Sequence, residues 1–96
     1  DISAVFAFND MTAFGVYNYT KKMNISIPKD LALVGYDDIF FSEILETPLT
    51  TIHQPIDEIG ILSVKILLLL AQGSKLKKNN YLLKPSLTIR KSSGIR

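Results

Sequence analysis

Two pairs of polar residues follow the two most apolar short runs of the chain. Asn9-Asp10 comes directly after the run Ala4–Phe8, and Asp37-Asp38 comes directly after Leu31–Tyr36. Ligands of open α/β sheets bind beyond the carboxyl ends of the strands, so both pairs are expected at one ligand-binding edge. Amides and carboxylates together offer donors and several acceptors, which suits a polyhydroxylated ligand. No metal is required for such a site.

Helix capping is the competing interpretation of these residues. Asn9, Asp10 and Asp38 each precede a predicted helical segment, and capping preferences favour that role over ligand binding for Asp10 and Asp38. Asp37 is harder to explain as a cap, so capping and binding both stay open for it. The candidate site therefore consists of Asn9 and Asp37, with Asp10 and Asp38 as further candidates.

Catalysis is a second alternative, because adjacent Asp residues after a strand also bind Mg²⁺ in phosphoryl-transfer sites. Asp37 and Asp38 fit that description, but the sequence has no Gly-rich phosphate loop of the known types. Its only histidine is His53, and no serine lies in a nucleophile-elbow pattern. The absence of cysteine excludes thiolate zinc sites and cysteine nucleophiles. We expect no catalytic residue, no metal and no cofactor.

The composition is that of an ordinary globular protein. The 96 residues are 47% hydrophobic and 21% charged, with a formal net charge of +2, which fits one small domain or a piece of a larger one. Lys75, Lys77 and Lys78 favour a solvated turn over a nucleic-acid surface. The apolar run Ile59–Ala71 is shorter than the ~20 residues that cross a bilayer. The lack of cysteine fits a reducing cytosol. A start without Met or a basic leader suggests that the chain begins partway through a gene product.

The first half of the chain alternates between strand and helix patterns. Ala4–Phe8 and Leu31–Tyr36 are predicted strands buried on both faces, and the spacing of apolar residues predicts a helix over Asp10–Met23 between them. A right-handed crossover then sets the two strands parallel in one sheet. The segment Ile39–Glu46 follows, with a one-sided apolar patch. Phe40 and Phe41 of this patch suit a core or a subunit interface, and the sequence alone favours the core, as it does for Phe14 and Tyr17.

The second half starts with the extended segment Pro48–Gln54. Pro55 begins the clearest helix of the chain, which reaches Ala71 before Gly73. Tyr81–Lys84 and Ser86–Arg90 are predicted short strands on either side of Pro85. The end, Lys91–Arg96, is expected to be a loose tail.

Four short motifs occur in an order and spacing that resemble the C-terminal part of lactose-repressor-family regulators. Together they cover nearly the whole chain, and although each is weak alone, four in sequence are highly specific. The motifs are Ala7–Gly15 (AFNDMTAFG), Ile27–Asp38 (IPKDLALVGYDD), Pro48–Pro55 (PLTTIHQP) and Leu87–Ser92 (LTIRKS).

This resemblance implies an α/β, periplasmic-binding-protein-like (type I) fold, with a parallel sheet and flanking helices. In that fold two lobes joined by crossing strands hold an effector in the cleft between them, and the chain is a fragment of the two-lobe domain. Residues 1–53 are then part of the C-terminal lobe. Residues 54–84 supply the crossover and a helix and strand that pack on the N-terminal lobe, and residues 85–96 supply a return strand and tail.

The resemblance also implies roles for single residues. Asn9 and Asp37 look like effector ligands, and Gln54, at the crossover, looks like a peripheral cleft residue. The helix from Met11 and the segment Phe40–Leu45 look like parts of the family's dimer face, which reverses the preference for the core. The implied dimer-interface residues are Met11, Phe14, Phe40, Phe41 and Ile44.

The implied function is that of an effector-binding and dimerisation module in a cytoplasmic bacterial repressor. A small-molecule effector, a sugar or related compound, would control operator binding allosterically, and DNA would be contacted only through an N-terminal headpiece outside this chain. The nearest alternative is a periplasmic sugar-binding receptor of the same fold, without a DNA-binding role.

Overall fold

The computed structural model describes residues 1–95, which form two compact units. One unit, here called the sheet unit, consists of Asp1–Gln54 and Ser86–Arg96, and the other, the helix unit, consists of Pro55–Pro85. None of the helices in residues 1–95 has the length and apolar character that crossing a bilayer requires.

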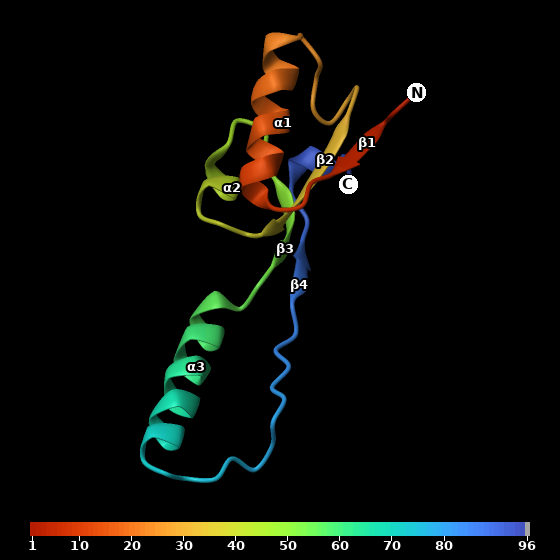
Figure 1. Ribbon diagram of the computed structural model, residues 1–96. Helices are drawn as coiled ribbons and strands as arrows, with labels where there is room; N and C mark the ends of the chain where they lie inside the picture. Colours follow the sequence, from red (N-terminus) through yellow and green to blue (C-terminus); the bar gives the residue numbers. More distant parts are fainter. Residues whose placement is uncertain (96) are drawn as a thin grey trace. The chain divides into compact units, whose positions relative to one another are not determined.

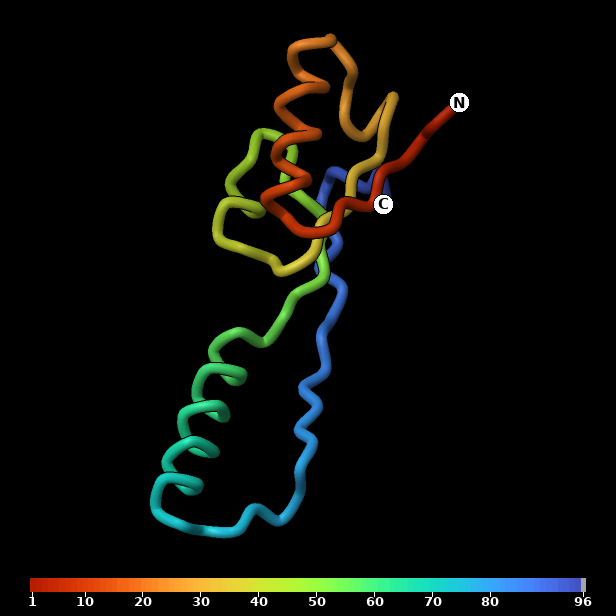
Figure 2. The backbone as a smooth tube through the Cα atoms, in the orientation of Figure 1, coloured from red at the N-terminus to blue at the C-terminus, as the bar shows by residue number. Residues whose placement is uncertain are grey.

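A four-stranded sheet in the order β1-β2-β3-β4 organises the sheet unit (Figure 1). Strands β1 (Ala4–Phe6), β2 (Ala32–Asp37) and β3 (Thr50–His53) run parallel, and β4 (Ser86–Thr88) pairs antiparallel with β3. The predicted parallel pairing of the first two strands is therefore confirmed, with Ala4–Phe6 set against Ala32–Val34. In Figure 2 the backbone leaves this unit after β3 and returns to it at β4.

Helix α1 (Asp10–Lys22) connects β1 to β2 and packs on β2 (Figure 1). Asn9 is its N-cap, and the two lysines of the last turn favour the negative end of the helix dipole. Asn24, just beyond the helix, has a φ of 55°, a left-handed conformation that Asn adopts more readily than most residues other than glycine. The core beneath α1 is small and consists of Ala7, Ala13, Tyr17, Leu33 and Leu49.

The buried carboxylate of Asp10 joins the start of α1 to two other parts of the sheet unit. Its side chain is 1% exposed and accepts hydrogen bonds from Ile39 N (2.9 Å), Ser42 Oγ (2.5 Å) and Thr51 Oγ1 (2.6 Å). Gly35 on β2 leaves the space for it, because a Cβ at that position would lie 2.2 Å from Asp10 Oδ1. This network fixes where the chain runs after β2.

The turn after β2 leads into the short helix α2 (Phe41–Ile44). Phe40 is 73% exposed and Phe41 is 56% exposed, and their rings meet edge to face at 5.7 Å. The preference for the core that the sequence alone gave is therefore wrong for both, although Tyr17 is buried and Phe14 packs partly against the core. The buried residue of α2 is Ser42, whose hydroxyl donates to Asp10.

The C-terminal segment is not the loose tail expected from the sequence. After β4 it forms a 3-10 helix, η1 (Lys91–Ser93), in which Ser92 is completely buried. Ser92 Oγ donates to Leu33 O (2.5 Å) and accepts from Thr50 N (2.8 Å). A serine that pairs with the backbone of two strands satisfies buried groups, and this fixes the segment against β2 and β3.

The helix unit contains α3 (Ile56–Ala71) and the segment that follows it. The helix was predicted to begin at Pro55, but Pro55 is its N-cap and the first helical residue is Ile56, while Gly73 after the helix has a φ of 77°. No residue of α3 is buried, although most of the helix is apolar. The predicted strand Tyr81–Lys84 is absent from the structure. A lone extended segment makes no ladder hydrogen bonds, and no neighbouring strand within residues 1–95 pairs with it.

We predict that Asp10→Ala strongly destabilises the full-length protein. The substitution leaves two hydroxyls and one backbone amide without their buried acceptor, and each costs about 1–3 kcal/mol. We expect a loss of about 3 kcal/mol or more in urea unfolding followed by circular dichroism. Glu46→Gln, which removes only an exposed ion pair with Lys21, is the control and should change stability by less than about 1 kcal/mol. Equal effects of the two substitutions would contradict the structural role of Asp10.

We also predict that the isolated 96-residue chain self-associates or is only marginally stable. Large apolar side chains are exposed in both units, including Leu67 (66%) on α3 and Phe40 (73%) next to α2. Extended apolar surface of this kind drives association in water. Sedimentation velocity at several concentrations tests this expectation, and a monodisperse monomer with a cooperative melting transition would contradict it.

Candidate functional site

A hollow of about 340 Å³ lies in the sheet unit where the parallel strands end. Three polar side chains line it: Asn9, which caps α1, Asp37 at the end of β2, and Gln54 after β3. Two aromatic residues, Phe8 and Tyr36, complete the lining. Three of the five predicted site residues, Asn9, Asp37 and Gln54, are thus brought together. The strand order explains this arrangement, because the carboxyl ends of β1, β2 and β3 meet at one edge of the sheet.

Asp37 is placed at the centre of this edge by its pairing in the sheet. It lies opposite His53 in the register of β2 and β3, and its Oδ1 accepts a hydrogen bond of 2.8 Å from Gln54 Nε2. Within residues 1–95 no hydrogen bond occupies the second carboxylate oxygen, Oδ2, of Asp37. An ionised carboxylate with an unused oxygen is a strong acceptor for a ligand hydroxyl.

Asn9 has a capping role and faces the hollow as well. Its Oδ1 accepts a hydrogen bond of 2.8 Å from Thr12 N, so the capping interpretation holds for this residue. The cap fixes the rotamer of the side chain and leaves the two N–H donors of its amide group for other partners. Capping and ligand binding are therefore compatible at Asn9, because they use different ends of one amide.

Asp10 lies outside the hollow, contrary to its candidate role as a ligand-binding residue. Its carboxylate is buried and is used by the backbone and the hydroxyl groups around it. It does not cap its own helix either, since Asn9 does so. Asp10 follows the N-cap and its side chain is buried inside the sheet unit. There it accepts hydrogen bonds from the hydroxyls of Ser42 and Thr51, so it is not available to a ligand in the hollow.

Asp38 is also absent from the residues that line the hollow. Its Oδ1 lies 2.7 Å from Arg90 Nη1, its Oδ2 lies 2.8 Å from His53 Nδ1, and its side chain is only 12% exposed. Burial disfavours the ionised form, but the hydrogen bonds and charges of Arg90 and His53 outweigh it and hold the pKa of the Asp38 carboxyl below its usual value. Its backbone N also donates to Thr51 Oγ1 at 3.3 Å. It does not cap α2, whose N-cap is Phe40.

Sequence reasoning missed the two aromatic residues and the partners of Asp38. Phe8 lines the hollow and is 87% exposed. It directly precedes Asn9, and this position next to a predicted ligand-binding residue could have indicated its role. Arg90 lies 52 residues after Asp38 in the chain, and no local pattern connects the two. Their pairing follows only from the antiparallel return of β4 beside β3.

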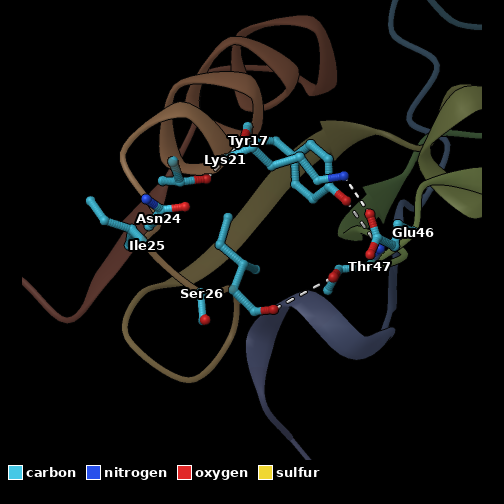
Figure 3. A pocket seen from close by; sticks show the side chains of 9 residues that line it. Tyr17, Lys21, Asn24, Ile25, Ser26, Glu46 and Thr47 are labelled. Carbon is cyan, nitrogen blue, oxygen red and sulfur yellow. Dashed lines mark hydrogen bonds and ion pairs between the residues drawn. The ribbon is translucent and has the colours of Figure 1, made fainter.

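A second cavity of the sheet unit, about 420 Å³ in volume, lies at the other end of α1 (Figure 3). Lys21 and Glu46 form an ion pair across it, and the hydroxyl of Tyr17 accepts a hydrogen bond from Thr47 N. The hydrogen bond of Lys21 raises its pKa and lowers that of Glu46, and both side chains are largely exposed. None of the predicted site residues lines this cavity.

The chemistry available at the hollow is recognition of hydroxyl groups. A carboxylate, two amides and two aromatic rings match a compact polar ligand that also has C–H faces. No group of three or more His, Cys, Asp or Glu side chains in residues 1–95 is arranged to hold a metal ion.

Comparison with known proteins identifies the family of this chain. Residues 2–93 match the family described as periplasmic binding protein-like domain. The chain is 46% identical over 65 residues to the ribose operon repressor of Escherichia coli (strain K12), an alignment that covers 68% of this chain and 20% of the repressor. It is 36% identical over 88 residues to the HTH-type transcriptional repressor PurR of Vibrio vulnificus, which covers 92% of this chain and 26% of PurR.

Solved structures of similar regulators share the fold. A LacI family transcriptional regulator from Enterococcus faecium with bound ribose superimposes with a TM-score of 0.90 at 38% identity, over 95% of this chain and 34% of that one. A periplasmic binding protein/LacI transcriptional regulator from Alkaliphilus metalliredigens, complexed with D-xylulofuranose, also has a TM-score of 0.90, at 31% identity over the same shares.

The chain thus spans about a fifth to a quarter of the length of these curated relatives, and about a third of the solved chains. The relatives are transcriptional regulators, and the expected fold class is confirmed by the match and by the superpositions. The chain belongs to the periplasmic binding protein-like domain family, and it corresponds to the C-terminal part of the effector-binding domain of lactose-repressor-family regulators.

Proposed function

We propose that this chain is the C-terminal part of the sugar-sensing core of a cytoplasmic bacterial transcriptional repressor, and that it binds its ligand without transforming it. The observation that carries this proposal is the convergence of Asn9, Asp37 and Gln54 on one hollow at the carboxyl edge of the sheet. The repressors among its relatives and the sugar-bound regulators that share its fold support the same reading.

A sugar fits the groups at this edge. Asp37 accepts hydrogen bonds from hydroxyl groups, the amides of Asn9 and Gln54 donate to ring or hydroxyl oxygens, and Phe8 and Tyr36 meet the C–H faces of a ring. Ribose is the first candidate, because one relative is a ribose operon repressor and one similar regulator was solved with ribose.

The two units suit different parts of such a regulator. Residues 1–53 and the return strand within residues 85–96 form one side of the effector cleft, and residues 54–84 pack on the other lobe. The exposed apolar surface of α3 supports this assignment, because a helix without buried residues needs a partner surface. Effector binding then favours one arrangement of the lobes and changes how DNA-binding headpieces outside this chain meet the operator.

A second copy of the protein is proposed to cover the aromatic surface beside α2. Met11, Phe40, Phe41 and Ile44 are all more than half exposed, whereas Phe14 is partly buried and packs against the core. Aromatic and Met side chains are enriched at the centres of protein interfaces. These residues form the proposed dimer interface.

A periplasmic sugar receptor of the same fold remains the alternative function. The curated relatives favour the repressor, because the ribose operon repressor and PurR both act in transcription. The sequence upstream of this chain decides between the two functions, since a helix-turn-helix segment identifies the repressor and a signal peptide identifies the receptor.

We predict that Asp37→Ala in the full-length protein weakens sugar binding by about 10- to 100-fold, which corresponds to about 1.5–3 kcal/mol. The substitution removes a charged acceptor and leaves ligand hydroxyls without a partner. A thermal-shift screen of pentoses, hexoses, sugar phosphates and purines identifies the ligand first, and calorimetry with D-ribose or the best sugar then measures the affinity.

Glu46→Gln serves as the matched control, because it removes another carboxylate of the sheet unit at the cavity away from the hollow. It should bind the sugar as the unaltered protein does. If Asp37→Ala binds with unchanged affinity, or if only purines shift the melting temperature, the proposed sugar site is wrong.

A further inference from the structure

We propose that Asp38 is a positioning residue for ligand binding. Its ion pair with Arg90 and its contact with His53 hold the backbone turn that directs Asp37 into the hollow. This inference rests on the proposed function and adds to it, because it makes the affinity of the site depend on a residue that does not line the hollow.

The turn that carries Asp37 has an unfavourable backbone conformation. Asp37 has a φ of 115° and Asp38 a φ of 57°, so two consecutive residues with side chains lie at positive φ. Such conformations are uncommon outside glycine and persist only where surrounding contacts hold them. They are also concentrated at ligand-binding sites, so the contacts that hold this turn are expected to matter for binding.

The ion pair between Asp38 and Arg90 is well placed to hold the turn. Arg90 approaches from the segment after β4, and its Nη1 lies 2.7 Å from Asp38 Oδ1 and donates to Leu49 O at 2.9 Å. Its backbone is fixed as well, because Arg90 N donates to Thr50 Oγ1 at 2.8 Å. The Arg90 side chain is only 17% exposed, so solvent screens this pair less than a surface pair.

His53 provides the second contact of Asp38 and connects it to the strand that carries the site. It pairs with Asp37 across β2 and β3 and with Ser86 across β3 and β4. Its Nδ1 lies 2.8 Å from Asp38 Oδ2, and the next residue in the chain, Gln54, donates to Asp37. Asp38 therefore contacts the last residue of β3, and the residue that follows β3 is a hydrogen-bond partner of Asp37.

Other contacts hold the fold when those of Asp38 are removed. The following residue, Ile39, is attached through its backbone N to the buried carboxylate of Asp10. Thr51 Oγ1 accepts from Asp38 N, an interaction that does not require the Asp38 side chain. We therefore expect variants of Asp38 to fold and the turn at residue 37 to lose its fixed orientation.

A double-mutant cycle in the full-length protein tests this inference, with D-ribose or the best sugar from the thermal-shift screen as the probe. Asp38→Ala should weaken binding about tenfold when Asp37 is present. In the Asp37→Ala background it should change the affinity by less than about twofold, because a positioning residue acts only through the residue that it positions. A purely structural role would weaken binding equally in both backgrounds, and that result would overturn the proposal.

Variants of Arg90 provide a second test, which stands even if Asp38→Ala folds poorly. Arg90→Gln should weaken binding about as much as Asp38→Ala, and Arg90→Lys, which keeps the charge but not the planar donor group, should weaken it less than Arg90→Gln does. Glu46→Gln breaks an ion pair far from the turn and should leave the affinity unchanged. Equal binding by Arg90→Gln and the unaltered protein, with both folded at the temperature of measurement, would refute the role of the ion pair.

A crystal structure of unliganded Asp38→Ala separates this inference from the proposed function, because it requires no ligand. We expect Asp37 to leave its positive φ or to lose its hydrogen bond with Gln54. An unchanged turn would overturn the inference and leave sugar binding by Asp37 intact. If instead Asp37→Ala binds sugar normally while the turn of Asp38→Ala has changed, the proposed function fails and the conformational role of Asp38 stands.

Discussion

The hydrogen bonds to the carboxylate of Asp10 determine how the segments at the carboxyl ends of the parallel strands are arranged. This carboxylate is buried at the start of α1, and it accepts hydrogen bonds from Ile39 N, Ser42 Oγ and Thr51 Oγ1. These donors come from the turn after β2, from α2 and from β3, so one side chain connects all the segments around the end of β2. A buried polar group is tolerated only when such partners satisfy it, which makes the network a strong constraint on the backbone.

The four polar residues at the strand ends, Asn9, Asp10, Asp37 and Asp38, therefore have different roles, although their side chains are chemically similar. Asp10 accepts hydrogen bonds in the interior, and Asp38 makes an ion pair with Arg90 and a hydrogen-bond contact with His53. Asn9 and Asp37 remain at the hollow with oxygen and nitrogen atoms that the protein leaves available to a ligand. The proposed binding function belongs to the pair whose hydrogen-bonding capacity is incompletely used, and the other pair fixes its geometry.

Local pattern predicted the elements and the edge of the sheet, since buried apolar runs alternating with a helix imply parallel strands whose ends meet. It did not distinguish the roles of the four polar residues. Those roles depend on hydrogen bonds and an ion pair with Ser42, Thr51 and Arg90, which are distant in sequence from the residues they contact. The burial of Ser92 was equally hidden, since its partners Leu33 and Thr50 belong to other strands. The strand expected over Tyr81–Lys84 failed for a related reason, because a strand requires a neighbour that local propensity does not supply.

The most direct measurement of the central claim is a crystal structure of the full-length protein with its sugar bound. The account predicts a sugar hydroxyl within about 2.5–3.0 Å of a carboxylate oxygen of Asp37, the usual length of such hydrogen bonds, with the amide of Asn9 on the same molecule. A sugar bound elsewhere, with Asp37 still paired only to Gln54, would contradict it.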